Sequence, residues 1–199
     1  MSILTQPLLD PYCTVVLQTS LNFPTGYIPP TVDSIAFLQY TSGSTSEPKG
    51  VMISHANLAH NLAIIVDELK ANIDTINVSW LPQYHDMGLI GSYLGLIYCG
   101  GKGYYLSPIS FLKDATVWLT CLSKFKGTHT QAPNFAYALS TRKFKEAIKS
   151  GGKIELDLSN IQHMINAAEP VDVKAIYEFY KVHFDVYDKF IVMMIIALE

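Results

Sequence analysis

The stretch that organises this sequence lies at residues 40–50 and reads Tyr40-Thr41-Ser42-Gly43-Ser44-Thr45-Ser46-Glu47-Pro48-Lys49-Gly50. Its hydroxyl groups and backbone N–H groups can converge on one concave site, because glycine permits tight backbone geometry. Lys49 adds a mobile positive charge, so the stretch predicts a phosphate-binding loop. The residues that we expect to contact phosphate are Thr41, Ser42, Gly43, Ser44, Thr45, Lys49 and Gly50.

A surface loop rich in serine, threonine and glycine is the alternative interpretation of this stretch. Its flanks favour a nucleotide site, because residues 34–40 are expected to form a buried strand before the loop and a helix soon follows it. The phosphate loop of kinases and GTPases is excluded, since its lysine follows the last glycine of the motif. Here Lys49 precedes Gly50, and Val51 comes next.

Beyond the loop, short apolar stretches alternate with stretches of helical periodicity. Ser54 is expected to cap a helix, in which His55 and Asn57 are either first-turn caps or substrate contacts. The expected strands lie at residues 77–81, 103–106, 127–131 and 161–165, and the expected helices at residues 54–69, 87–98, 111–125 and 171–182. This alternation predicts an α/β fold with a largely parallel sheet that is covered by helices on both faces.

The composition narrows the class of protein. The chain has 199 residues, of which 49% are hydrophobic and 16% charged, so a sizeable core is expected. A net charge of −3 without a basic cluster predicts no nucleic-acid partner. Three scattered cysteines argue against a disulfide framework and a zinc site. No signal peptide or membrane-length apolar run is recognised, so we expect a cytoplasmic protein without a membrane span.

Polar residues follow the expected strand at 77–81, and strand ends of this kind bind ligands in parallel sheets. Asp86 could fix the orientation or the charge of the neighbouring His85 imidazole, as happens at reacting carboxylates and phosphates. The alternative is a structural histidine. Phe135 and Tyr137 could likewise be core aromatics, and Glu169 could be the acidic residue that a helix N-terminus favours.

Thr41 to Gly50 matches every fixed position of Thr-Ser-Gly-Ser-Thr-x-x-Pro-Lys-Gly, the phosphate-binding signature of the adenylate-forming (AMP-binding) superfamily, which the chain therefore resembles. Residues 80–89 (WLPQYHDMGL), 107–119 and 133–139 (PNFAYAL) further resemble fatty acyl-AMP ligases and disco-interacting-protein-like AMP-binding domains. Residues 166–170 resemble the family's Asn-Gly-Ala-Glu-Pro turn, which holds adenine. Ala167 replaces the glycine, and its β-carbon opposes a close approach of the backbone to adenine.

The resemblance implies roles for particular residues. Lys49 and His85 would be catalytic. The acyl group would contact His85, Asp86, Met87, Gly88, Phe135 and Tyr137. The adenine turn would comprise Asn166, Ala167, Ala168, Glu169 and Pro170. The apolar helix expected at 87–98 would line the acyl tunnel, although ordinary core is the alternative.

The resemblance also implies a reaction, in which ATP and Mg²⁺ activate a fatty acid to acyl-AMP and pyrophosphate. The acyl group would pass to a carrier-protein pantetheine, supplied by an acyl carrier protein or a polyketide synthase. The alternatives are a fragment of an acyl-CoA synthetase and a non-catalytic interaction domain. Most Mg²⁺ ligands, the ribose aspartate and a C-terminal lysine are not recognised, so we expect the chain to be inactive alone. The expected organisation is an extended lead-in (1–32), a partial AMP-binding domain (33–186) and an aberrant apolar tail (187–199). The partial domain would be the incomplete N-terminal domain of the adenylate-forming fold.

Overall fold

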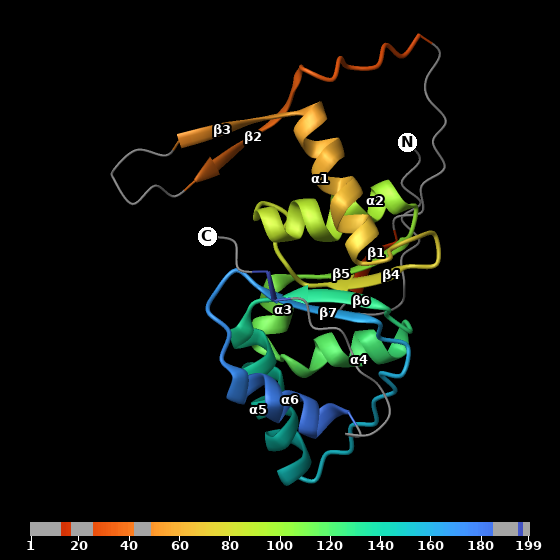
Figure 1. Ribbon diagram of the computed structural model, residues 1–199. Coiled ribbons are helices and arrows are strands. Elements are labelled where there is room, and N and C mark those ends of the chain that lie inside the picture. The colour runs from red at the N-terminus through yellow and green to blue at the C-terminus, as the bar shows by residue number, and fades with distance from the viewer. Residues whose placement is uncertain (1–12, 17–25, 42–48, 185–194, 197–199) are drawn as a thin grey trace.

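The computed structural model of the chain describes residues 13–16, 26–41, 49–184 and 195–196. Its centre is a six-stranded sheet in the order β1-β5-β4-β6-β7-β8 (Figure 1). The strands β5, β4, β6, β7 and β8 run parallel, and β1 pairs with β5 in the antiparallel sense at one edge. The bounds are β1 Cys13–Val16, β4 Ile76–Ser79, β5 Lys102–Leu106, β6 His129–Ala132, β7 His163–Ala167 and β8 Ile195–Ile196.

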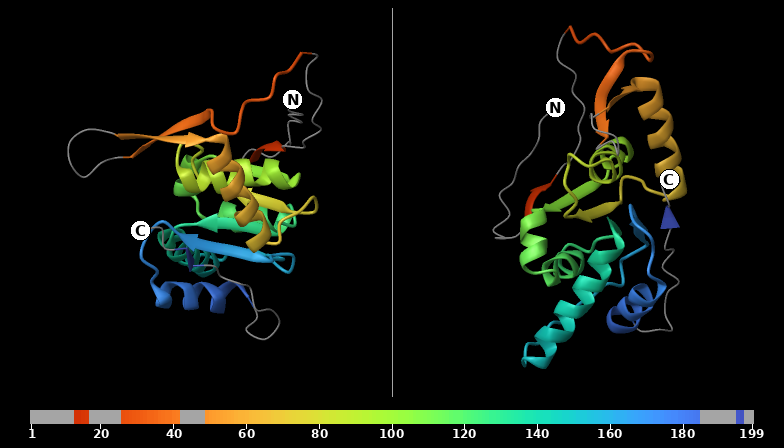
Figure 2. Two further views of the ribbon diagram at one scale, coloured as in Figure 1. Left: turned by 45° about the horizontal axis from the view of Figure 1, so that its top comes forward. Right: turned by 90° about the vertical axis from the view of Figure 1, so that its left-hand side faces the viewer.

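Helices cover both faces of this sheet, as Figures 1 and 2 show. One face carries α1 (His55–Glu68), the π-helix η1 (Met87–Leu94) and α2 (Gly95–Cys99). The other carries α3 (Pro108–Lys113), α4 (Thr116–Lys124), α5 (Asn134–Lys149) and α6 (Val173–His183). The largely parallel, doubly covered α/β sheet predicted from the sequence is therefore confirmed.

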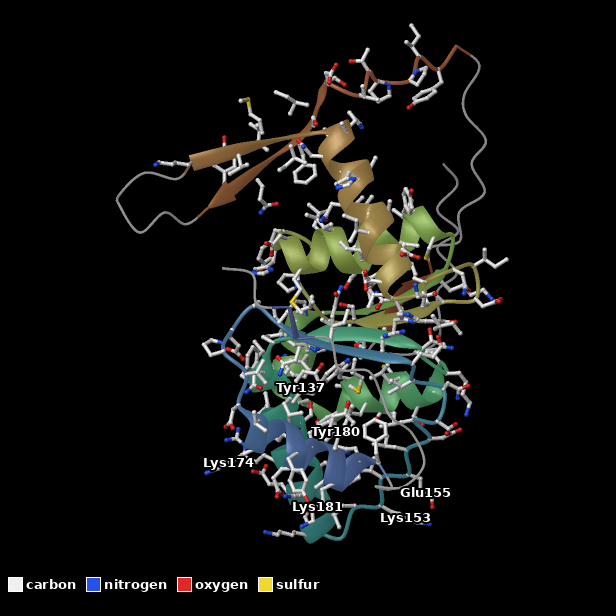
Figure 3. All side chains as sticks on the ribbon, in the orientation of Figure 1. Tyr137, Lys153, Glu155, Lys174, Tyr180 and Lys181 are labelled. Carbon is white, nitrogen blue, oxygen red and sulfur yellow. The ribbon has the colours of Figure 1, made fainter. Side chains whose placement is uncertain are left out.

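The main core lies between the sheet and the layer formed by α4, α5 and α6. Trp118, Tyr137 and Phe179 are each almost wholly buried and pack ring against ring. Trp118 Nε1 donates to Thr130 Oγ1 at 2.9 Å, which gives its polar atom a partner inside the core. Each of these side chains stabilises the fold by about 1.5–3 kcal/mol through burial. Figure 3 shows Tyr137 inside this layer and Lys174 and Lys181 at its surface.

Two helices differ from the sequence prediction. The single helix expected at residues 111–125 is divided into α3 and α4, because Asp114 is extended and its Oδ1 accepts from the backbone N–H and hydroxyl of Thr116. Asp114 thus ends α3, and its carboxylate binds the first residue of α4. The helix expected at 87–98 is present, but its first part is the π-helix η1.

The phosphate-loop region belongs to a separate two-stranded antiparallel ribbon, formed by β2 (Ile35–Thr41) and β3 (Lys49–Ser54). The strand expected at 34–40 is present as β2, but the prediction that it is buried is wrong, since Tyr40 is 64% exposed. Met52 of the neighbouring β3 is 67% exposed. The ribbon extends beyond the helices that cover the sheet (Figure 1), so these side chains have little to pack against. After the ribbon, Ser54 caps α1 as predicted, and Asn57 completes the capping box.

Candidate functional site

Three of the segments selected from the sequence follow three neighbouring strands. His85 and Asp86 follow β4, Phe135 follows β6, and residues 167–170 end or follow β7. The strands β4, β6 and β7 are adjacent and parallel, so their carboxyl ends lie at one edge of the sheet. We call this the carboxyl edge. Ligands bind at such edges in open α/β sheets.

At the end of β4, Asp86 orients His85. The Asp86 Oδ1 oxygen lies 2.8 Å from His85 Nδ1 and also accepts from the backbone N–H of Met87 at 2.7 Å. The same backbone N–H also donates to His85 Nδ1 at 3.3 Å, so the Nδ1 side of the ring faces Asp86 and Met87. The Nε2 atom is then the ring nitrogen that can meet a substrate. The sequence predicted that Asp86 could orient this imidazole, and the contact is present; the catalytic role of His85 stays a prediction.

The π-helix that begins at Met87 is held close to the sheet. Gln131 of β6 is buried, and its Nε2 donates to the Met87 carbonyl oxygen at 3.0 Å and to Ser92 Oγ. A β-carbon at Gly91 would lie 2.6 Å from Gln131 Nε2, and one at Gly88 would lie 2.2 Å from the Pro82 carbonyl oxygen. Gly88 is therefore required by its close approach to the backbone, whereas a side chain at position 91 would displace the Gln131 amide from these hydrogen bonds. Gln131 was not predicted as a site residue, because the register of β6 against η1 cannot be read from sequence.

An aromatic cluster lies beside the carboxyl edge. Trp80 stacks on Phe111 with ring centroids 3.9 Å apart, and Phe135 packs edge-on against both. Phe135 is 42% exposed, so its ring remains open to a ligand. Tyr137 is only 1% exposed, and its hydroxyl donates to the Ile165 carbonyl oxygen at 2.8 Å. Burial raises the pKa of Tyr137 well above its ordinary value, which fits the core alternative.

The turn predicted to hold adenine begins in β7. Asn166 is fully buried, Ala167 is the last residue of β7, and Ala168 has a left-handed φ of 70°. The backbone strain thus falls on Ala168 rather than on Ala167, the residue that the sequence placed at the family's glycine. The Glu169 carboxylate accepts from the backbone N–H of Phe135, at the start of α5. The Glu169 side chain does meet a helix N-terminus. That helix is α5, however, and not α6, the helix that follows Glu169 in the sequence.

The phosphate loop is described only at its two ends. Thr41 and Lys49 are cross-strand partners at the tip of the ribbon, and Tyr40 is paired with Gly50. A β-carbon at Gly50 would lie 3.3 Å from the Tyr40 ring, so glycine gives this ring room. The other predicted phosphate contacts, Ser42, Gly43, Ser44 and Thr45, lie outside the described residues.

A groove of about 600 Å³ lies between β3, α1 and η1. It is lined by Ile53, Ala56, Asn57, Leu58, His60, Asn61 and Ile90. Ile90 belongs to the apolar helix that the sequence associated with the acyl chain. Within the described residues, no group of three or more His, Cys, Asp or Glu side chains could hold a metal ion. No described helix is long and apolar enough to cross a membrane.

His129, to which the sequence gave no role, lies at the opposite, amino-terminal edge. Its Nε2 donates to the Leu69 carbonyl oxygen at 2.9 Å, which leaves Nδ1 to accept from Thr128 Oγ1 at 2.8 Å. His163, its partner across β6 and β7, lies with its ring centroid 4.8 Å away. Burial lowers the pKa of both imidazoles. Their position away from the carboxyl edge indicates a structural role.

The parallel sheet and the gathering of these segments at its carboxyl edge are typical of α/β proteins that bind ligands at that edge. The sequence profile of AMP-binding enzymes matches residues 13–192, and the chain belongs to that family. A medium-chain-fatty-acid–[acyl-carrier-protein] ligase of Teredinibacter turnerae is 42% identical over 156 residues, which are 77% of this chain and 24% of the relative. The long-chain-fatty-acid–AMP ligase of Mycolicibacterium smegmatis is 35% identical, over 75% of this chain and 24% of the relative.

Solved structures of fatty acyl-adenylate ligases also match this chain. The fatty acyl-adenylate ligase of Legionella pneumophila, in complex with acyl adenylate and pyrophosphate, superposes with a TM-score of 0.69 and 44% identity. The superposition covers 79% of this chain and 27% of that structure. The resemblance to fatty acyl-AMP ligases drawn from the sequence is therefore confirmed. The chain spans about a quarter of the length of the relatives that it matches.

Proposed function

We propose that this chain forms the part of a fatty acyl-AMP ligase that receives ATP and the fatty acid carboxylate. The proposal rests on one observation: the His85, Phe135 and Asn166–Pro170 segments gather at one edge of the sheet, in a chain that also carries the complete phosphate-binding signature. The whole reaction would yield acyl-AMP and pyrophosphate. The acyl group would then pass to the pantetheine of an acyl carrier protein or a polyketide synthase.

Lys49 and the loop donors would act on the phosphates. Attack of the fatty acid carboxylate on the α-phosphate builds negative charge on the phosphate oxygens and on the leaving pyrophosphate. Hydrogen-bond donors and a lysine that are already in place stabilise that charge without reorganisation. His85, oriented by Asp86, would present Nε2 to the carboxylate or to the α-phosphate.

The adenine end of ATP would meet residues 166–170. Asn166 Oδ1 is buried and has no hydrogen-bond partner among the described residues. Such an acceptor is costly to bury alone, and the exocyclic amino group of adenine is a donor of the kind that it needs. The turn therefore fits the group that the family binds. ATP supplies the phosphoric anhydride bond that is cleaved, and Mg²⁺ neutralises its phosphates.

The acyl chain would follow the groove between α1 and η1. Ile53 and Ile90 give the groove apolar walls, and Phe135 has an exposed ring near the carboxyl edge. Each additional buried methylene contributes about 0.8 kcal/mol, so affinity is expected to rise roughly fourfold per carbon until the groove is full. Non-hydrolysable octanoyl-, decanoyl- and dodecanoyl-adenylate analogues, titrated calorimetrically into the chain, test this. Equal affinity along the series would refute the acyl assignment.

The same titration tests the proposed function as a whole. Decanoyl-adenylate analogue is expected to bind more tightly than AMP, and Lys49→Ala is expected to weaken pyrophosphate binding but not decanoate binding. A chain that binds none of these ligands would contradict the proposal.

Pyrophosphate exchange into ATP by the isolated chain is expected to stay at the no-protein level. Product analysis with coenzyme A or with an acyl carrier protein would separate the two acceptor classes in an active form. The cytoplasmic location expected from the sequence stays a prediction.

A further inference from the structure

The first turn of α5 is held by a distant part of the chain. Its N-cap residue, Pro133, contributes no side-chain hydrogen bond. The backbone N–H of Phe135, in the first turn, instead donates to the carboxylate of Glu169. The first turn of a helix leaves such N–H groups without internal partners, and a carboxylate is favoured there. The start of α5 is thus bound to the turn that follows β7.

The residue before Phe135 makes a second connection to the same turn. Asn134 is 8% exposed, and its Oδ1 accepts from Asn166 Nδ2 at 2.9 Å and from the backbone N–H of Asp172 at 3.1 Å. A backbone N–H can only donate, so the Asn134 atom that it meets must be the oxygen. The Asn166 atom that meets the same oxygen must then be its nitrogen. One oxygen atom therefore ties both ends of the segment 166–172 to α5.

Between these ties the backbone is strained. Ala168 has a φ of 70°, in the left-handed region that alanine rarely adopts. Residues in such conformations persist only where the surrounding structure fixes them, and they gather at ligand sites. The contacts of Asn166, Glu169 and Asp172 with the start of α5 enclose Ala168 on both sides along the chain.

We propose that Asn134 is a positioning residue for nucleotide binding, which fixes segment 166–172 in the shape that receives adenine. The inference rests on the proposed function. By engaging Asn166 Nδ2, Asn134 also fixes which way the Asn166 amide points, and this leaves the buried Asn166 Oδ1 as an acceptor without a partner among the described residues. Without the Asn134 oxygen the Asn166 amide loses its anchor and Ala168 can relax into an ordinary conformation.

The test compares two probes, AMP and inorganic tripolyphosphate, in calorimetric titrations of the 199-residue chain. Asn134→Leu removes the accepting oxygen, and Asn134→Asp keeps an oxygen in its place. Ser140→Ala is the matched control, because Ser140 lies on the same helix, is fully buried and donates its hydroxyl to the Ala115 carbonyl oxygen at 3.3 Å, away from segment 166–172. Asn134→Leu is expected to weaken AMP binding roughly tenfold, which corresponds to one lost hydrogen bond, and to leave tripolyphosphate binding unchanged. Asn134→Asp is expected to restore most of the AMP affinity.

Loss of both ligands in Asn134→Leu, or an equal loss of AMP in Ser140→Ala, would show a general structural role and overturn the inference. Amide hydrogen exchange gives a readout that needs no ligand. Asn134→Leu is expected to accelerate exchange at Phe135 and Asp172 at least tenfold relative to the amides of β4, because their tie is loosened. If the wild-type chain binds no AMP, the proposed function fails, and unchanged exchange at these two amides would refute the positioning role separately.

Discussion

The β2–β3 ribbon and the carboxyl edge of the sheet carry the two halves of the proposed site, but they are held in different ways. At the carboxyl edge, Asn134, Gln131 and Glu169 each bond a segment that lies more than 30 residues away. On the ribbon, Tyr40 and Met52 are more than 60% exposed. The carboxyl edge, which would bind adenine, is therefore shaped by long-range contacts among the described residues. The ribbon, which would bind the phosphates, has an exposed surface that is open to further contacts.

The largest expected effect lies in the core beneath the carboxyl edge. Trp118→Ala is expected to lower the free energy of unfolding by about 3–5 kcal/mol, because it removes a fully buried aromatic ring and leaves a cavity. Met52→Ala on the ribbon is the matched change, and it is expected to cost less than about 0.5 kcal/mol. Urea unfolding followed by tryptophan fluorescence and circular dichroism measures both. If the two substitutions lower the free energy of unfolding by the same amount, the two regions do not differ in how strongly they are packed.

The pH dependence of stability reports on the same helix layer. His183 lies between Phe144 and Phe179, and burial, assisted by Lys145, lowers its pKa to about 4. The unfolded imidazole, with its ordinary pKa of 6.5, binds a proton first as the pH falls. The stabilisation is therefore complete above about pH 6.5, declines as the pH falls toward 4, and levels off below that, with a total loss of roughly 1–3 kcal/mol.

His183→Phe isolates this contribution, because the ring can still pack between the same two phenylalanines. The difference in unfolding free energy between the wild type and His183→Phe is expected to change between pH 6.5 and 4. It is expected to be constant above pH 7. His129, which is buried, and His163, which is half-buried, contribute equally to both proteins and cancel. A pH-independent difference would mean that His183 is as easily protonated in the folded chain as in the unfolded one.

The ribbon is expected to matter for ligand binding. Lys49→Ala is expected to weaken tripolyphosphate binding by roughly tenfold or more, since a charge-assisted hydrogen bond contributes about 1.5–3 kcal/mol. Lys70→Ala, at the far end of α1, is the control for the general loss of one positive charge. Titration calorimetry at constant ionic strength measures both. If the two variants lose affinity equally, the phosphate is attracted by overall charge and the loop has no special role.

The smallest expected effect concerns the strained turn. Ala168→Gly is expected to raise the free energy of unfolding by up to about 1 kcal/mol, because glycine adopts a φ of 70° without a steric penalty. Ala167→Gly is the matched control, and it is expected to destabilise the chain, since Ala167 lies in β7 with a buried side chain. Thermal unfolding measures the pair. Stabilisation by Ala167→Gly instead would place the strain at Ala167, the position that corresponds to the family's glycine.

Local sequence determined much of the fold and part of the site. The phosphate-binding signature, the helix cap at Ser54 and the alternation of strands and helices are written in consecutive residues, so they could be predicted without a structure. The contact between His85 and Asp86 could also be expected, since the two residues are neighbours. The division of one expected helix at Asp114 was missed, although the preference of aspartate for helix caps was a local signal for it.

Only the tertiary structure decided how these segments are held. The sequence gives no sign that one oxygen of Asn134 meets both Asn166 and Asp172, or that Gln131 anchors the π-helix. Such contacts depend on strand order and on the register between β6 and β7, which are set by packing of the whole sheet and not by neighbouring residues. The exposure of the ribbon has the same origin, because alternating apolar residues predict a strand but do not show what covers it. The sequence therefore determined which residues are candidates for the site, and the tertiary structure decided which of them are fixed in place.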